Sequence, residues 1–264
     1  MQKTRNQIVF RLQTSDFQLN PIPINNDTTI KTTMKTYSAI DDCVLGGLNA
    51  PCFGNLLPEE MELVKDSKVQ VLFRKGESLT KQGAFASSVL FVVEGLVRQY
   101  IIGDTNRDFN LRIIRSSEFI GLSAAFSKHT YDYSTVALKE TLACLIEKDA
   151  IAGLIKSNGS FAYGLINRYY ENDSSLYDTI RSMMYKQMHG RLADVLLYLD
   201  TVKYDDESIF AFLSRKEIAD FAGLSTESTV KLLKGFEKDG LIKLVDKDIE
   251  VIEREALKEI SKRG

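Results

Sequence analysis

One stretch decides the fold class of this 264-residue chain: Ser214-Arg-Lys-Glu-Ile-Ala-Asp-Phe-Ala-Gly223-Leu-Ser225-Thr-Glu-Ser-Thr-Val-Lys-Leu-Leu-Lys-Gly-Phe236. Ser214, followed three residues later by Glu217, forms a capping box that predicts a short helix over 215–222. Gly223 stands where a turn between two helices needs a positive φ. Ser225 is suited to cap a second helix. The stretch therefore predicts a helix-turn-helix.

The second helix is expected to have one buried and one polar side. Val230, Leu233 and Phe236 recur every three residues and are expected to form the buried side. On the polar side, Glu227 can accept from a cytosine amino group, and Lys231 can reach guanine acceptors or a phosphate. Serine hydroxyls and a further lysine suit backbone phosphates. The predicted DNA-binding residues are Ser214, Arg215, Ser225, Thr226, Glu227, Ser228, Lys231 and Lys234.

A short hairpin is predicted directly after the second helix. Residues 241–245 and 249–252 read as two strands joined by a turn at 246–248, which would form a wing beside the helix-turn-helix. The chain has a net charge of −2, and residues 214–264 hold eleven basic and eleven acidic side chains. Because only one face of one helix must meet phosphate, this weak charge does not exclude DNA. A packing unit without a DNA role is the alternative interpretation.

The N-terminal half has a strand pattern. Val69, Val71 and Phe73 alternate with polar residues, and similar alternation recurs at 109–113 and 142–146. Apolar runs at 89–93 and 96–102 flank Glu94-Gly95. Short strands with turns about every ten residues predict an antiparallel sandwich or barrel.

A long helix is expected between these two regions. From about 160 to 187 apolar residues recur at spacings of three and four, and such a helix would be roughly 40 Å long. A stripe of that length is interpreted as a dimer seam, with an internal linker helix as the alternative. We expect residues 1–33 to be a disordered or mis-started tail, and 34–150, 151–190 and 191–264 to be a sensor domain, a dimerisation helix and a winged domain. The predicted stripe is Leu165, Tyr169, Leu176, Ile180, Met183 and Gln187.

Composition and motifs narrow the functional classes. No apolar run approaches the ~18 residues that a membrane helix needs, and no signal peptide is visible, so a cytoplasmic protein without a membrane partner is expected. No phosphate-cradling loop, nucleophile elbow or zinc-protease motif occurs, so we expect no enzyme. A dimeric adaptor that does not bind DNA is a remote alternative.

Six short motifs occur along the chain: Phe73-x-Lys75-Gly76-Glu77, Gln82-Gly83, Glu94-Gly95, Phe119-Ile120-Gly121, Gly190-Arg191-Leu192 and the helix-turn-helix at Leu213–Ile242. Taken together, these residues resemble the CRP/FNR family of bacterial regulators over about residues 43–252. The resemblance implies an α+β fold with an N-terminal antiparallel, cyclic-nucleotide-binding-like β-roll, a long dimerisation helix and a C-terminal winged helix-turn-helix. It also implies a homodimer on a near-palindromic DNA operator, with RNA polymerase as a further partner if the protein activates.

The resemblance also locates an effector pocket. Family members that bind cyclic nucleotides have Gly-Glu-Leu and a later Arg-Ser or Arg-Thr, but the aligned stretches here are Gly121-Leu122-Ser123 and Tyr133-Ser134-Thr135. The carboxylate position is therefore Leu122, and the arginine position is Tyr133. Without the arginine a buried phosphate loses its main partner. We therefore expect no cAMP binding in the family's manner and leave the small-molecule effector unidentified.

The cysteines fit the FNR branch of the family in part. That branch holds a 4Fe–4S cluster on Cys-x2-Cys-x5-Cys plus one cysteine in the β-roll, and here Cys43, Gly46 and Cys52 align, with Cys144 at the fourth position. Three thiolates and an oxygen ligand could hold such a cluster, which would make the protein a redox, oxygen or NO sensor. In the alternative interpretation, Cys144 is a small apolar residue on one face of a strand.

Overall fold

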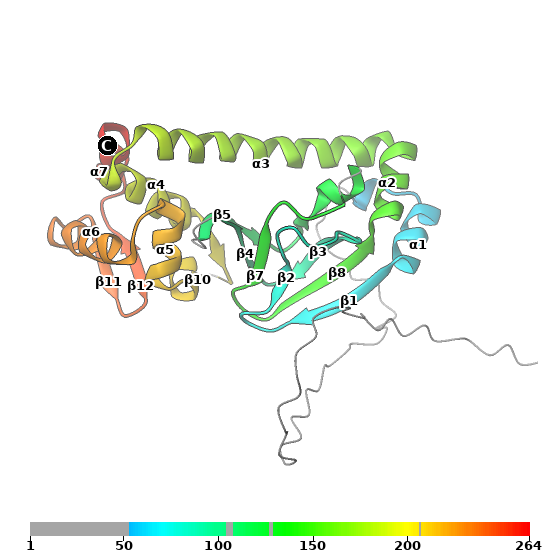
Figure 1. Ribbon diagram of the computed structural model, residues 1–264, viewed down its shortest axis with the longest axis horizontal. Helices are drawn as coiled ribbons and strands as arrows, with labels where there is room; N and C mark the ends of the chain where they lie inside the picture. The colour runs from blue at the N-terminus through cyan, green and yellow to red at the C-terminus, as the bar shows by residue number, and fades with distance from the viewer. Residues whose placement is uncertain (1–52, 104–107, 127–128, 206) are drawn as a thin grey trace, which may run out of the picture. The chain divides into compact units, whose positions relative to one another are not determined.

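The computed structural model describes four stretches of the chain, residues 53–103, 108–126, 129–205 and 207–264. The predicted tail at 1–33, Cys43, Gly46 and Cys52 lie outside these described residues. Most strands come first along the chain and most helices later (Figure 1). The helices are η2 Phe53–Asn55, α1 Pro58–Asp66, η3 Leu122–Phe126, α2 Lys148–Ser157, α3 Gly159–Tyr185, α4 Met188–Thr201, η4 Ile209–Phe212, α5 Arg215–Ala222, α6 Thr226–Lys238 and α7 Arg254–Arg263.

The predicted strands form two four-stranded antiparallel sheets, with orders β1-β8-β3-β6 and β2-β7-β4-β5. This confirms the antiparallel β-roll, and we use that name for β1–β8. Two further pairs, β9–β10 and β11–β12, lie in the C-terminal part. The strands are β1 Lys68–Phe73, β2 Ser78–Thr80, β3 Ser88–Glu94, β4 Leu96–Ile102, β5 Asp108–Arg115, β6 Phe119–Ile120, β7 Ser134–Ala137, β8 Thr141–Glu147, β9 Lys203–Tyr204, β10 Glu207–Ser208, β11 Ile242–Val245 and β12 Asp248–Val251.

The β-roll encloses an apolar core because alternate strand residues point inward. Phe53 and Phe91 are buried there, with ring centroids 5.1 Å apart in an edge-to-face arrangement. Gly95 joins β3 to β4 at φ 123°, and a Cβ at this position would lie 2.4 Å from Thr141 Oγ1. The two apolar runs that flank Glu94-Gly95 are therefore separate strands, and the position between them requires glycine.

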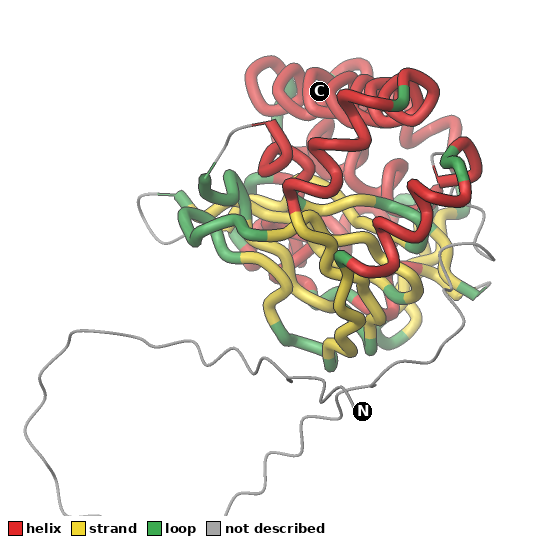
Figure 2. The backbone as a smooth tube through the Cα atoms, turned by 90° about the vertical axis from the view of Figure 1, so that its right-hand side faces the viewer, coloured by secondary structure: helices red, strands yellow, loops and turns green. Residues whose placement is uncertain are grey.

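The long helix predicted over about 160–187 is α3, Gly159–Tyr185. The wider range 151–190 is not one helix, because α2 ends at Ser157 and α4 begins at Met188. Asn158 separates the first two helices and caps α3, since its side chain accepts from Phe161 N at 2.9 Å. At the other end, Lys186 and Gln187 are both extended. Viewed end-on, α3 lies on one side of the strands (Figure 2).

Residues 188–264 form a winged domain with a second apolar core. This core also includes Leu96, Ile113 and Leu138 of the β-roll, so the two parts share buried apolar surface. Tyr198 of α4 adds a polar contact, because its hydroxyl accepts from Ile113 N at 2.9 Å. No helix within the described stretches is both long enough and apolar enough to cross a membrane.

Candidate DNA-binding face and ligand cleft

The first helix of the helix-turn-helix begins as the capping box predicts. Ser214 Oγ accepts from Glu217 N at 3.2 Å, and Glu217 Oε2 accepts from Ser214 N at 2.8 Å. The helix ends at Gly223, whose φ of 60° is left-handed. A Cβ on Gly223 would lie 3.0 Å from the Met183 sulfur, so the turn is also tightly packed. The predicted capping box and the positive φ predicted for Gly223 are both confirmed.

The second helix, α6, buries a different stripe from the one predicted. Ser225 caps it by accepting from Ser228 N at 3.1 Å, as expected. Thr229, Leu233 and Phe236 are buried, whereas Val230 is only half-buried, so the assignment of Val230 to the buried side was wrong. The reason is geometric: steps of four and then three residues keep one face at 3.6 residues per turn, whereas repeated steps of three drift around the helix.

The outer face of α6 consists of exposed polar side chains. Thr226, Glu227, Lys231 and Lys234 lie there, and none of these side chains has a hydrogen-bond or ion-pair partner among the described residues. Each can therefore contact a molecule outside the chain. Ser228 is half-buried, and its hydroxyl accepts from Ser225 Oγ at 2.8 Å. The structure thus groups four of the eight predicted DNA-binding residues on one surface, which we call the α6 face: Thr226, Glu227, Lys231 and Lys234.

Arg215 lies apart from the α6 face. It is half-buried at the start of α5, and its Nη2 donates to the carbonyl oxygen of Asp246 at 3.3 Å. Its Nη1 is buried without a hydrogen-bond partner among the described residues. Burial lowers the pKa of this guanidinium, and Asp248 partly opposes that shift. The contacts tie Arg215 to the wing turn rather than present it with the α6 face.

The predicted wing is confirmed as the β11–β12 hairpin, which pairs Ile242 with Val251 and Val245 with Asp248. Asp246 turns it at a positive φ of 51°. Leu244 N donates to Glu237 Oε1 of α6 at 3.0 Å, so the wing is joined to α6 directly.

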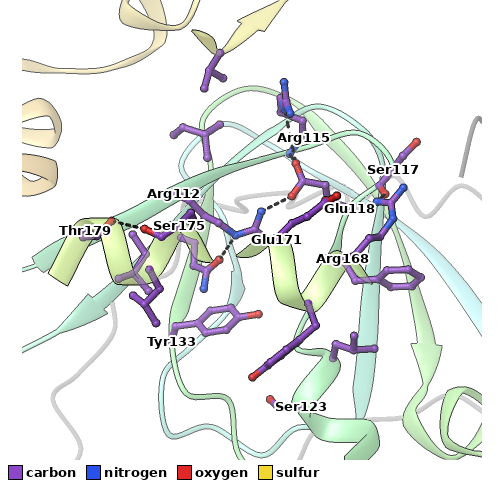
Figure 3. A pocket seen from close by; sticks show the side chains of 18 of the residues that line it. Arg112, Arg115, Ser117, Glu118, Ser123, Tyr133, Arg168, Glu171, Ser175 and Thr179 are labelled. Carbon is purple, nitrogen blue, oxygen red and sulfur yellow. Dashed lines mark hydrogen bonds and ion pairs between the residues drawn. The ribbon is translucent and has the colours of Figure 1, made fainter. Parts of the chain in front are cut away.

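A cleft of about 1050 Å³ lies between the β-roll and α3. Strands β4 and β5 supply one wall, and α3 and the end of α4 supply the other. Figure 3 shows Arg112 of β5 in this cleft with Glu171, Ser175 and Thr179 of α3. Of the five predicted effector-pocket residues, Leu122, Ser123 and Tyr133 line the cleft, whereas Gly121 and Ser134 do not. The hydroxyl of Ser134 instead accepts from Gln82 N at 3.0 Å.

Tyr133 occupies the position that the family resemblance assigns to arginine. Its hydroxyl accepts from Gly121 N at 2.8 Å, so the two predicted motifs contact each other within the protein. Burial raises the pKa of Tyr133, and the hydrogen bond from Gly121 partly opposes that shift. The tyrosine therefore uses the backbone donor of the glycine motif internally.

The arginines of the cleft also have internal partners. Arg112 forms a close ion pair with Glu118 and donates to Gln99 Oε1 at 2.9 Å. Arg115 lies 3.7 Å from the same carboxylate, and Arg168 of α3 donates to the Ser117 carbonyl at 2.5 Å. Sequence reasoning missed Arg168, because only the packing of α3 against the β-roll brings it to the cleft.

Cys144 lies at 0 % exposure in the β-roll core, where its sulfur accepts from Gln70 Nε2 at 3.6 Å. That is the environment of a small apolar core residue. Across the described stretches, no three His, Cys, Asp or Glu side chains are grouped to hold a metal ion. The described residues thus do not form a cluster site, and the iron–sulfur hypothesis stays a prediction that depends on Cys43 and Cys52.

Two family models match the chain, and together they span more than half of it. Residues 70–158 match the cyclic nucleotide-binding domain, and residues 190–260 match the Crp-like helix-turn-helix domain. The first match covers most of the β-roll, including the strand wall of the cleft, and the second covers the helix-turn-helix with its α6 face. Helix α3 lies outside both matches.

Similar proteins and structures agree with these matches. The transcriptional activator protein FnrA of Stutzerimonas stutzeri is 24% identical over 85% of this chain and 93% of its own length. The cyclic AMP receptor protein of Thermus thermophilus is 25% identical over 80% of this chain and 97% of its own. FixK2 from Bradyrhizobium japonicum has a TM-score of 0.65 at 20% identity, covering 73% of this chain and 96% of its own. A CRP/FNR-family transcriptional regulator from Thermus thermophilus has a TM-score of 0.60 at 22% identity, covering 74% and 100%.

Proposed function

The chain belongs to the CRP/FNR family of transcription regulators, and from that premise we propose that it is a homodimer that binds a near-palindromic operator through two α6 faces. The α6 face carries this proposal, because its polar side chains are exposed and have no partners among the described residues. Such a face suits base and phosphate contacts in a major groove. It supports regulation through DNA binding rather than catalysis.

A selection from random-sequence DNA tests this proposal. We expect the full chain to enrich a sequence with two half-sites about one helical turn apart, and gel-shift binding to weaken as salt rises. A scrambled duplex of equal length and composition is the matched control. Equal binding to the selected and scrambled duplexes at every salt concentration would refute sequence-specific regulation.

The dimer proposal rests on an exposed apolar stripe of α3. Its members follow one another at steps of three, four, seven, three and four residues, which fits the seven-residue repeat of a helix-pairing seam. It differs from the stripe predicted from sequence, because Leu165 is buried and both Leu165 and Leu176 line the cleft. Ile180 belongs to both. Tyr169 is also exposed but lines the cleft as Leu176 does. We call six of the other exposed apolar residues of this helix the α3 stripe: Tyr163, Ile166, Tyr170, Tyr177, Ile180 and Met184.

A charge placed in the α3 stripe tests the dimer. Ile180 is 45 % exposed, and Leu63 of α1, a second apolar helical residue, is 46 % exposed. In sedimentation, we expect Ile180→Glu to yield monomers and Leu63→Glu to leave the dimer intact. Operator affinity of Ile180→Glu should fall roughly a hundredfold or more, because a monomer reaches only one half-site. A wild-type chain that sediments as a monomer at all concentrations would rule the dimer out.

We further propose that the cleft binds a small-molecule effector other than cAMP. Tyr133 and Leu122 stand where the resemblance places an arginine and a carboxylate, and the Tyr133 hydroxyl already accepts from Gly121 N. Calorimetric titration with cAMP should therefore show no binding. Saturable binding of cAMP that is lost in Ser123→Trp, a variant meant to fill the cleft, would overturn this exclusion.

A further inference from the structure

A buried arginine of the β-roll faces the helix-turn-helix. Arg98 of β4 is 8 % exposed, and its Nη1 donates to Asn110 Oδ1 at 2.5 Å. Its Nε lies 3.4 Å from Glu217 Oε1 of α5, whereas Asp108 of its own hairpin lies further away, at 3.8 Å. The nearer carboxylate of this buried cation thus belongs to the winged domain.

Asn110 of β5 extends the contact to the backbone of α5. The side chain is 1 % exposed, and its Nδ2 donates to the carbonyl oxygen of Glu217 at 2.8 Å. Its Oδ1 accepts from Arg98, so both ends of the amide are used. A buried amide that lost either partner would be destabilising, so the contact favours one docking arrangement.

The turn of the helix-turn-helix lies against the same hairpin. A Cβ on Gly223 would lie 3.6 Å from Phe109 Cε2, so the residue next to Asn110 packs beside the turn. The β4–β5 hairpin therefore touches both ends of α5, Glu217 in the first turn and Gly223 at its end.

The same two strands also line the cleft. Gln99 follows Arg98 on β4, and Arg112 lies two residues after Asn110 on β5. Gln99 and Arg112 are register partners, and both line the cleft. A ligand that displaced either of them would act on the hairpin that holds α5.

We propose that Arg98, Asn110 and Glu217 form a clamp that fixes the orientation of the winged domain on the β-roll. The clamp couples the cleft to the α6 face through the β4–β5 hairpin, and its effect on DNA rests on the function proposed above. A dimer whose two winged domains are held at one angle binds two half-sites without first ordering them. The three clamp members are positioning residues, because none lies on the α6 face.

Two conservative variants of the full chain remove the clamp's charges. Glu217→Gln keeps the capping box, because glutamine also serves at this position, and Arg98→Gln removes the buried cation. The matched control is the exposed ion pair of α1, through Lys65→Gln and Glu62→Gln. Paired spin labels at non-natural residues replacing Lys75 and Glu259 report the distance from β-roll to winged domain, with excess unlabelled chain added to suppress signals between subunits.

We expect a narrow distance distribution in the wild type and the control variants, and a broad one in both clamp variants. Affinity for the selected operator should fall roughly tenfold in each, while binding to scrambled DNA stays the same. Because the two residues act through one contact, the double variant should lose little more than either single variant. Arg98→Lys should recover part of the loss.

Unchanged distance distributions in both clamp variants would overturn the clamp. Tighter operator binding by these variants would overturn its positive role in DNA recognition. If the wild type selects no DNA, the regulator proposal fails by itself, and the distance measurement still decides whether the clamp holds the two parts.

Discussion

The α6 face and the cleft differ in whether their polar side chains have partners within the protein. On the α6 face, Glu227 and Lys231 are exposed and have no partner among the described residues. In the cleft, Arg112 pairs with Glu118, and Tyr133 with Gly121. A face whose groups are solvated and unpaired can bind an external partner without breaking internal contacts. A ligand of the cleft must instead compete with the protein's own pairs, so its binding would rearrange them.

The largest effect should be on operator affinity, from substitutions of the unpaired side chains of the α6 face. Lys231→Ala and Glu227→Ala should each lower operator affinity by ~1–3 kcal/mol and relax base preference, because each removes a contact with a base edge. Lys234→Ala should weaken all DNA about equally and reduce the salt slope by about 1. Gel shifts over a salt series measure both quantities. Equal losses on all sequences for the three variants would show that the α6 face is misassigned.

The internally paired side chains of the cleft should instead contribute to the free energy of unfolding. Arg112→Met leaves the Glu118 carboxylate, whose side chain is 20% exposed, without its close partner, and should lower the free energy of unfolding by ~2 kcal/mol. Lys231→Met, which breaks no hydrogen bond or ion pair among the described residues, should change it by less than ~0.5 kcal/mol. Urea unfolding of both variants makes the comparison. A similar loss of unfolding free energy in the two variants would contradict the difference between the α6 face and the cleft.

Tyr133 gives the contrast a pH dependence. Tyr133→Phe removes the acceptor of Gly121 N–H and should cost ~1 kcal/mol. Because burial raises the pKa of Tyr133 above its ordinary 10.0, the folded state retains the phenolic proton more strongly than the unfolded state does. Its contribution is complete below pH 10.0 and is lost as pH rises through the folded pKa. Unfolding series at alkaline pH should be less steep for Tyr133→Phe, and identical slopes would contradict this.

The smallest effect should lie beneath the α6 face. Thr229 is fully buried, and its hydroxyl has no hydrogen-bond partner among the described residues. Thr229→Val should therefore raise the free energy of unfolding by ~0.5–1 kcal/mol without changing operator affinity. Thermal unfolding and a gel shift on one preparation measure both. Lower stability in the variant would mean that the hydroxyl has a partner, such as a bound water.

Local patterns predicted the elements well, because they depend on residues close in sequence. The strand predicted around Val69 is β1, and the capping box at Ser214 and Glu217 is formed. The predicted alternation of buried and exposed residues in that strand was wrong, because Val69 is 58 % exposed and its neighbours are half-buried. Spacing alone could not rank Thr229 against Val230, since both fit a loose apolar period. It also could not separate the two apolar sides of α3, because only the packed β-roll decides which side is covered.

The candidate sites depended still more on distant contacts. Arg215 was grouped with the DNA-binding residues, yet the structure joins it to the wing turn thirty-one residues later. The internal pairs of the cleft link β-roll strands to one another and to α3, and no sequence period encodes such pairs. The break between α3 and α4 also could not be predicted, because Lys186 and Gln187, which form it, are neither proline nor glycine. Lys186 is instead held by Asp194 of α4, at 2.9 Å from its ammonium group.

Glu217 places an evolutionary constraint on the chain. One of its carboxylate oxygens caps the start of α5 and the other faces Arg98. A single residue therefore contributes both to the stability of a helix and to the alignment of two domains. Most replacements would disturb both properties at once and would be removed by selection for stability alone. Glutamine retains the first property and gives up the charge of the second. Drift to glutamine would thus be a single step by which a descendant could keep its fold while the response of its DNA-binding domain to the β-roll changed.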